Sequence, residues 1–105
     1  MIINLSETSC RTWSQAQFEA ARELAKEGWV RDHIPPEVDP EISSEDLFKL
    51  ANEVAIKMLK LGNVDGAIIQ GEPGLSFNII SLLLGKIPCY YVCSREEKFI
   101  QFREY

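Results

Sequence analysis

A glycine-containing loop has the residue types and spacing that best suit ligand chemistry in this chain. The loop 70–74, QGEPG, follows the apolar run 64–69 and precedes a second apolar segment. Glycines permit a close approach of the backbone to a ligand, and the N-terminus of a following helix carries partial positive charge. The loop lacks the lysine of a P-loop and the three-glycine spacing of a dinucleotide fingerprint. The loop is therefore a weak signal for a phosphate site, with a plain tight turn as the alternative.

Arg95 is the best single candidate for contact with an anion. It directly follows the apolar run 87–93, and a guanidinium matches the geometry of a phosphate. A surface ion pair with a nearby glutamate, Glu96, Glu97 or Glu72, is the alternative. Glu72 would repel a phosphate beside it, so its carboxylate is better suited to accept from a ribose hydroxyl or a base amine. The single histidine, His33, stands beside a proline pair and is interpreted as structural rather than catalytic.

The elements that must position these residues alternate between strands and helices. Runs 64–69 and 87–93 are almost continuously apolar, as in strands that are buried on both faces of a parallel sheet. With the helix between them they predict a right-handed β-α-β unit. Further strands are expected at 2–5, at 29–34 and after a turn at 94–98. Helices are expected from Ser14 to near Gly28, from Ser43 or Ser44 to Gly62, and over 75–84.

The fold class predicted from this order is α/β, within a single domain spanning residues 1–105. We expect a Rossmann-like three-layer sandwich with a mainly parallel sheet of four to five strands, three helices and a C-terminal strand. Ligands of open α/β sheets bind outside the carboxyl ends of the strands. Loop 70–76, the pair Ser94 and Arg95, and the hydroxyl-rich loop Ser6 to Ser9 are therefore expected to share one crevice.

Two aromatic or apolar features allow two interpretations. Ser14 and Gln17 form a capping box, and Trp13 with Phe18 fits a hydrophobic staple, although Trp13 is also able to stack on a base. The helix expected over 75–84 is apolar on almost every side. Pairing of two copies through this helix explains that pattern, with burial beneath the other helices as the alternative.

Composition excludes several function classes. The net charge of −5 argues against non-specific binding to duplex DNA. No apolar segment is long enough to span a bilayer and no signal peptide is recognisable, so we expect a cytoplasmic protein without membrane association. The three cysteines are expected to be reduced, because Cys89 and Cys93 lie too far apart on one strand to pair. No cofactor or metal site is predicted.

Several of these segments together resemble a known family. They are the strand and loop 68–72, the helix carrying Ser76 and Phe77, the strand end 93–95, the opening INLS and the closing FIQFREY. In these features the chain resembles the small stand-alone CRISPR-associated proteins with a Rossmann-like fold, akin to CARF domains.

The resemblance implies a homodimer that binds a cyclic oligoadenylate where its two crevices merge. Some such proteins are ring nucleases that linearise this messenger without a metal, through attack of a ribose 2′-hydroxyl that leaves a 2′,3′-cyclic phosphate. The catalytic residues that it implies are Arg95, Glu72 and Ser76. The implied ligand-binding residues are Ser6, Thr8, Ser9, Gln70, Gly71, Gly74, Phe77 and Ser94. A non-catalytic sensor or a protein-interaction subunit remains the alternative.

Overall fold

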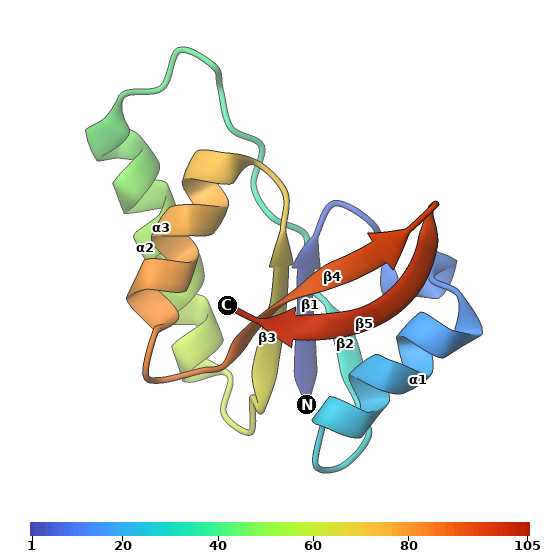
Figure 1. The fold of residues 1–105 in the computed structure, drawn as a ribbon. Helices are drawn as coiled ribbons and strands as arrows, with labels where there is room; N and C mark the ends of the chain where they lie inside the picture. The colour runs from blue at the N-terminus through green and yellow to red at the C-terminus, as the bar shows by residue number, and fades with distance from the viewer.

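The chain folds around one five-stranded sheet with the strand order β2-β1-β3-β4-β5. The computed structural model describes all 105 residues (Figure 1). The strands are β1 (Ile2–Ser6), β2 (Val30–Asp32), β3 (Gly66–Gln70), β4 (Cys89–Arg95) and β5 (Lys98–Glu104), and the helices are α1 (Gln15–Leu24), α2 (Ser44–Lys60) and α3 (Pro73–Leu83). The strands β1 to β4 are parallel, and β5 is antiparallel to β4. The predicted α/β class, with a mainly parallel sheet and three helices, is confirmed.

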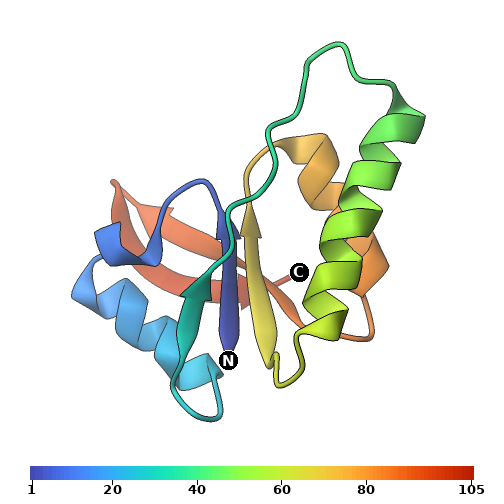
Figure 2. The same ribbon diagram turned by 180° about the vertical axis from the view of Figure 1, so that it is seen from behind.

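The helices lie in two layers on opposite faces of the sheet. α2 and α3 pack on one face, and α1 packs on the other (Figure 2). The alternation of side chains along the strands matches this arrangement, since Ile3 and Leu5 face α2 and α3 whereas Ile2 and Ile68 face α1. The cluster beneath α2 and α3 contains 13 buried residues and the cluster beneath α1 only 4, so most of the core lies on one side.

The serine side chains expected at the starts of α1 and α2 cap these helices. Ser14 accepts from the N–H of Gln17 at 3.2 Å, and Ser43 accepts from the N–H of Asp46 at 3.0 Å. The expectation that α1 continues to near Gly28 was wrong. Ala25 takes an extended backbone conformation, with φ −91° and ψ 130°, and ends the helix at Leu24.

The hairpin between β4 and β5 has a tighter turn than the predicted 94–98. Ser94, Arg95 and Lys98 belong to the strands, which leaves only Glu96 and Glu97 in the turn. Both glutamates have positive φ, 51° and 65°, as a type I′ turn requires. Glutamate rarely adopts this conformation, so the sequence carries no signal for a two-residue turn here.

The double substitution Glu96→Asn with Glu97→Gly is expected to stabilise the fold. Asn-Gly is the preferred pair for a type I′ turn, and it relieves two strained positions, so the free energy of unfolding should rise by about 1 kcal/mol. Urea denaturation measures this change. The converse substitution, Glu97→Val, serves as the control and should destabilise. A double variant less stable than wild type would contradict the turn assignment.

Pairing between β3 and β4 stops soon after it begins. Only Ala67 with Cys89 and Ile68 with Tyr90 are in register. Beyond them the strands diverge, and the hairpin curls over the α1 side of the sheet (Figure 1). There Phe102 contacts Trp13, with ring centroids 6.0 Å apart. Side chains bridge the opening: Gln70 Oε1 accepts from the N–H of Val92 at 3.1 Å, and the hydroxyl of Tyr105 donates to the carbonyl of Ile69 at 2.6 Å.

Gly66 marks the tightest approach among the central strands. A Cβ at this position would lie 2.8 Å from the ring of Tyr90 and 3.2 Å from the carbonyl oxygen of Pro88. Gly66→Ala is therefore expected to lower the free energy of unfolding by about 1–2 kcal/mol, through overpacking. Gly71→Ala is the control, because its Cβ would meet no atom closer than 3.7 Å. Equal stability of the two variants in thermal denaturation would contradict this account.

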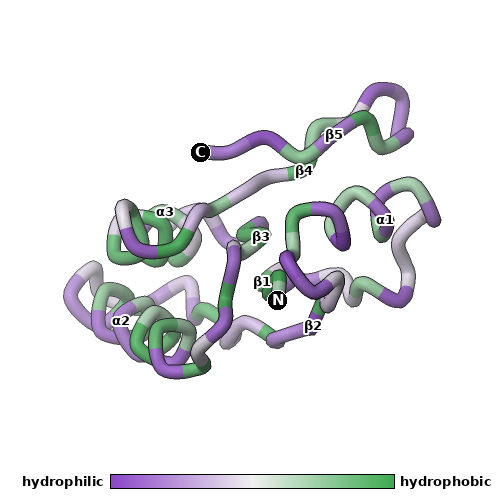
Figure 3. Tube along the Cα trace, turned by 90° about the horizontal axis from the view of Figure 1, so that it is seen from below, coloured by the Kyte–Doolittle hydropathy of each residue, from purple (hydrophilic) through white to green (hydrophobic).

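The largest apolar side chains left exposed at α3 lie on the outer side of this helix. Figure 3 shows apolar residues around most of α3, in contrast to the mixed surfaces of α1 and α2. Phe77 and Leu84 on its outer side are 70% and 69% exposed. No helix has the combined length and hydropathy of a membrane span. All three cysteines are free, Cys10 and Cys89 being buried and Cys93 half-buried.

Candidate functional site

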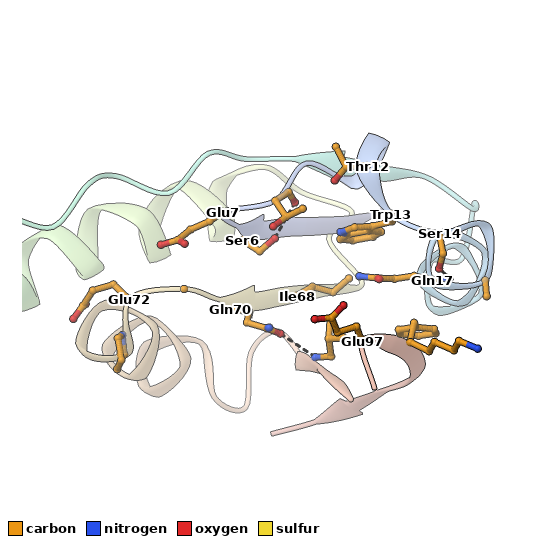
Figure 4. A pocket seen from close by; sticks show the side chains of 17 residues that line it. Ser6, Glu7, Thr12, Trp13, Ser14, Gln17, Ile68, Gln70, Glu72 and Glu97 are labelled. Atoms are coloured by element: carbon orange, nitrogen blue, oxygen red, sulfur yellow. Dashed lines mark hydrogen bonds between the residues drawn. The ribbon is translucent and has the colours of Figure 1, made fainter. Parts of the chain in front are cut away.

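A cleft opens at the carboxyl ends of β1 and β3, where the chain connections diverge. From β1 the chain crosses through α1 on one face, and from β3 it crosses through α3 on the other, which makes this the switch point of the sheet. The cleft has a volume of about 1050 Å³ (Figure 4). We call it the first cleft. Its polar and aromatic lining residues include Ser6, Glu7, Thr8, Thr12, Trp13, Ser14, Gln17, Gln70, Glu72, Glu97, Lys98 and Phe99.

A buried hydrogen-bond network fixes the hydroxyl loop that forms one wall of this cleft. Asn4, 1% exposed within β1, donates from Nδ2 to the carbonyl of Thr8 at 2.8 Å and to Asp32 Oδ1 at 2.9 Å. Its Oδ1 accepts from the hydroxyl of Ser6 at 2.7 Å. The Asn4 side chain is thus hydrogen-bonded to both Ser6 and Thr8, and to Asp32 on the neighbouring strand β2.

Asp32 anchors the far end of the same loop. Its carboxylate accepts from the hydroxyl of Ser9 at 2.6 Å and from the N–H of Cys10 at 2.9 Å, in addition to Asn4. Burial alone would raise the pKa of Asp32, but the donated hydrogen bonds outweigh burial and lower this pKa to about 2. Burial, and then the neighbouring carboxylate of Asp32, raises the pKa of the Cys10 thiol. The carboxylate therefore stays ionised and the thiol protonated at neutral pH.

The loop after β3 forms the opposite wall, and some of its polar side chains already make hydrogen bonds within the protein. Glu72 caps α3, with its Oε2 accepting from the N–H of Leu75 at 2.6 Å. Gln70 uses its carbonyl oxygen to hold Val92, so its amide N–H groups remain without a partner in the protein. Glu7 approaches from the first wall, and its Cγ would lie 3.7 Å from a Cβ atom placed on Gly71. Figure 4 shows Glu7 and Glu72 on the two sides of the opening.

The N-terminus of α1 and the β4–β5 turn close the remaining side. Ser14 and Gln17 belong to the α1 cap, where the first-turn N–H groups have no intrahelical partner. Trp13, Gln17 and Ile68 lie around the same part of the cleft (Figure 4). Lys98 is the only cationic side chain in the lining, against the carboxylates of Glu7, Glu72 and Glu97. The first cleft is consequently polar, aromatic at one end and acidic on balance.

A second cleft lies on the α3 side of the same loops, with a volume of about 440 Å³. Its walls are the extended segment 34–38, the end of β3 and the first turns of α3. Apolar side chains dominate this lining, namely Leu5, Ile34, Pro35, Pro36, Val38, Ile69, Leu75 and Ile79. Glu7, Gln70, Gly71 and Glu72 line both clefts and form a ridge between them.

The structure brings together about half of the residues that the sequence suggested. Those lining the first cleft are Ser6, Thr8, Gln70, Gly71 and Glu72, and Ser76 lines only the second cleft. Ser9 faces a separate hollow beside His33, where it is bound to Asp32. Those that line neither cleft are Gly74, Phe77, Ser94 and Arg95.

Arg95 lies at the end of β4 with its side chain exposed and makes no hydrogen bond or ion pair in the protein. The alternative ion pair with a nearby glutamate is likewise not formed. Gly74 has a packing role, since a Cβ there would lie 2.8 Å from Leu47 Cδ2 on α2. The two-residue turn after Arg95 keeps this residue within β4 and outside the clefts. Gly74 lies outside them because its backbone packs closely against α2.

His33 takes the structural position that its neighbours indicated. Its backbone N–H donates to the backbone carbonyl of Asn4 at 2.9 Å. His33 lines the hollow beside Asp32 rather than the first cleft. Burial, followed by the positive charges of Lys57 and Arg31, lowers the pKa of His33. The imidazole is therefore neutral at physiological pH, and His33 lines neither the first nor the second cleft.

Sequence reasoning missed Asn4, Asp32, Gln17 and Lys98. Asn4 is a polar residue within an otherwise apolar strand, which was an available signal for a buried network. Lys98 is one of several charged residues near the turn, and nothing in its spacing distinguished it from Arg95. Comparison of the chain with protein-family models, with curated proteins and with solved structures found no match.

Proposed function

We propose that this chain binds a cyclic oligoadenylate at the first cleft. The observation that carries the proposal is the position and lining of this cleft: it opens at the switch point and combines hydroxyls, a helix N-terminus, one lysine and two aromatic rings. Its volume of about 1050 Å³ exceeds the needs of a small metabolite and suits a ligand of several nucleotides. The family resemblance of the sequence adds the identity of the nucleotide.

The wall made by α1 and the turn suits a phosphate. The N–H groups of Gln15 and Ala16, which the Ser14 cap leaves free, and the positive end of the helix dipole favour an anion at this helix start. The ammonium of Lys98 lies in the same lining. Lys98 thereby takes the role that the sequence suggested for Arg95. The hydroxyl of Thr8 supplies a neutral donor in the same cleft, whereas the hydroxyl of Thr12 already donates to the carbonyl of Ser9 at 2.7 Å.

The aromatic end of the cleft suits a base. Trp13 and Phe99 both line it, and aromatic faces stack on purines without a requirement for charge. The carboxylates of Glu7 and Glu97 then accept from ribose hydroxyls or from the adenine amine. These carboxylates also repel long polyanions such as duplex DNA, as does the net charge of −5. A small cyclic ligand fits this charge better.

We propose further that the bound ring is linearised. A ribose 2′-hydroxyl attacks its own phosphodiester in line, the P–O5′ bond breaks, and the products carry a 2′,3′-cyclic phosphate and a 5′-hydroxyl. The protein contributes alignment of the attacking oxygen and stabilisation of the charge that develops on the phosphate. Lys98 and the α1 N-terminus are the groups proposed for the second contribution.

We also propose that two copies pair through the outer side of α3. The segment 73–85 contains no charged residue, so a second copy covers Phe77 and Leu84 without removing any charge from water. Phe77 and Leu84 line neither cleft. Light scattering after size-exclusion chromatography tests this pairing, with a dimer expected for wild type and a monomer for Phe77→Asp.

The direct test is incubation of the purified protein with cyclic tri-, tetra- and hexa-adenylate without metal. Linear products ending in a 2′,3′-cyclic phosphate are expected on chromatography, and the ring that is consumed identifies the substrate. Intact rings that co-elute with the protein would restrict the function to binding. Intact rings without any binding would overturn the proposal and leave a protein-interaction role.

A further inference from the structure

We infer that the second cleft is a binding site for an uncharged planar base, and that a ligand in the first cleft extends into it across the ridge. The inference deepens the proposed function and rests on it for the identity of the ligand, adenine. Its evidence is separate, because it comes from the shape, the apolar lining and the charge of the second cleft.

The second cleft has the size and surface of a site for one ring. Its volume of about 440 Å³ falls within the range of small-ligand pockets. Ile69 and Leu75 form its buried floor, and Pro36 and Val38 form its outer wall. Apolar side chains on both sides favour a rigid, weakly polar group such as a planar ring, which loses little conformational freedom on binding.

The charges of the lining select against phosphate. Glu7, Glu37 and Glu72 contribute carboxylates, and no lysine, arginine or histidine lines this cleft. Glu7 and Glu37 form no ion pair with any other residue. A carboxylate without a partner accepts hydrogen bonds, and the exocyclic amine of adenine donates two. The second cleft therefore suits the part of a nucleotide that donates hydrogen bonds and carries no charge.

The ridge explains how one ligand reaches both clefts. Gly71 has no side chain to separate them, and Gln70 and Glu72 contribute to both linings. Gln70 is held in one orientation because its Oε1 accepts from the N–H of Val92, which leaves the two amide N–H groups for a ligand. A sugar and its phosphate oxygen crossing the ridge meet these neutral donors, with the charged phosphate toward Lys98 and the base toward Val38.

The test combines two simple probes with a pair of matched variants. Adenosine and inorganic phosphate are titrated separately into ¹⁵N-labelled protein. Ser76→Trp fills the second cleft from α3, whereas Ser44→Trp places the same ring on an exposed position at the start of α2, outside both clefts. Val38→Trp fills the cleft from the opposite wall and keeps the test valid if Ser76→Trp fails to fold.

Adenosine is expected to shift the amide signals of Val38, Leu75 and Ser76, and phosphate is expected to leave them unchanged. In Ser76→Trp and Val38→Trp the adenosine shifts should disappear and the affinity for the cyclic ring should fall at least tenfold. The control Ser44→Trp should bind both ligands as the wild type does. Ring affinity unaffected by both filling variants would overturn the inference while the proposed function stands. Adenosine shifts in the second cleft of a protein that binds no ring would support the base site and overturn the proposed function.

Discussion

Replacing Asp32 with alanine is expected to lower the free energy of unfolding by about 3–4 kcal/mol. The carboxylate accepts hydrogen bonds from Asn4, Ser9 and Cys10, and each bond to a charged acceptor contributes roughly 1.5–3 kcal/mol in favourable cases. Solvent near the partly exposed loop reduces the sum. Urea denaturation measures the effect. Asp39→Ala is the control, because Asp39 is exposed and accepts only one bond, from the N–H of Glu41.

The acid dependence of stability distinguishes this network from a simple packing effect. The pKa of Asp32 is lowered from 3.8 to about 2, so its contribution is fully present above pH 3.8 and is lost as the pH falls through 2. Wild type and Asp32→Asn should therefore differ most at neutral pH and converge in acid. A stability difference that stays constant from pH 7 to below pH 2 would contradict the role of the ionised carboxylate.

Lys98→Ala is expected to weaken binding of the cyclic oligoadenylate on the order of 10- to 100-fold. This range corresponds to the loss of one charge-assisted hydrogen bond to phosphate. Arg95→Ala is the matched control, since it removes one positive charge from the same hairpin but from a side chain outside the first cleft. Isothermal titration calorimetry at two salt concentrations separates a direct contact from the general effect of charge.

A direct contact makes the loss in Lys98→Ala persist at high salt, whereas the small effect of Arg95→Ala should disappear there. The opposite ranking, with Arg95→Ala the more damaging variant, would return the phosphate contact to the residue that the sequence suggested. Thermal denaturation of both variants provides the necessary check on folding, because both side chains are exposed.

The sequence predicted the fold well because its signals are local and agree with one another. The nearly continuous apolar runs of β3 and β4, the serine caps of α1 and α2, and the glycine after α2 each depend on a few neighbouring residues. The same holds for the loop 70–74, which lies at the predicted edge of the sheet. Local patterns of this kind fix the order of the elements and, through the handedness of crossovers, the sheet.

The details of the site depended on interactions that no local pattern contains. The network of Asn4 and Asp32 requires the lateral pairing of β1 with β2, in which these two residues are register partners. The placement of Lys98 rather than Arg95 in the cleft depends on the positive φ of two glutamates and on an irregular register between Cys93 and Ser94. Gly74 meets a leucine that lies on a different helix.

The short pairing of β3 with β4 has a consequence for motion. The β4–β5 hairpin supplies one wall of the first cleft, yet two register pairs and two side-chain hydrogen bonds, from Gln70 and Tyr105, connect it to β3. A strand paired along its whole length would be held by its ladder of backbone hydrogen bonds. Beyond Tyr90 this hairpin is held instead by side chains, namely the two hydrogen bonds to β3 and the contact of Phe102 with Trp13. We therefore expect amide hydrogen exchange in β4 to be faster from Val92 onward than at Cys89.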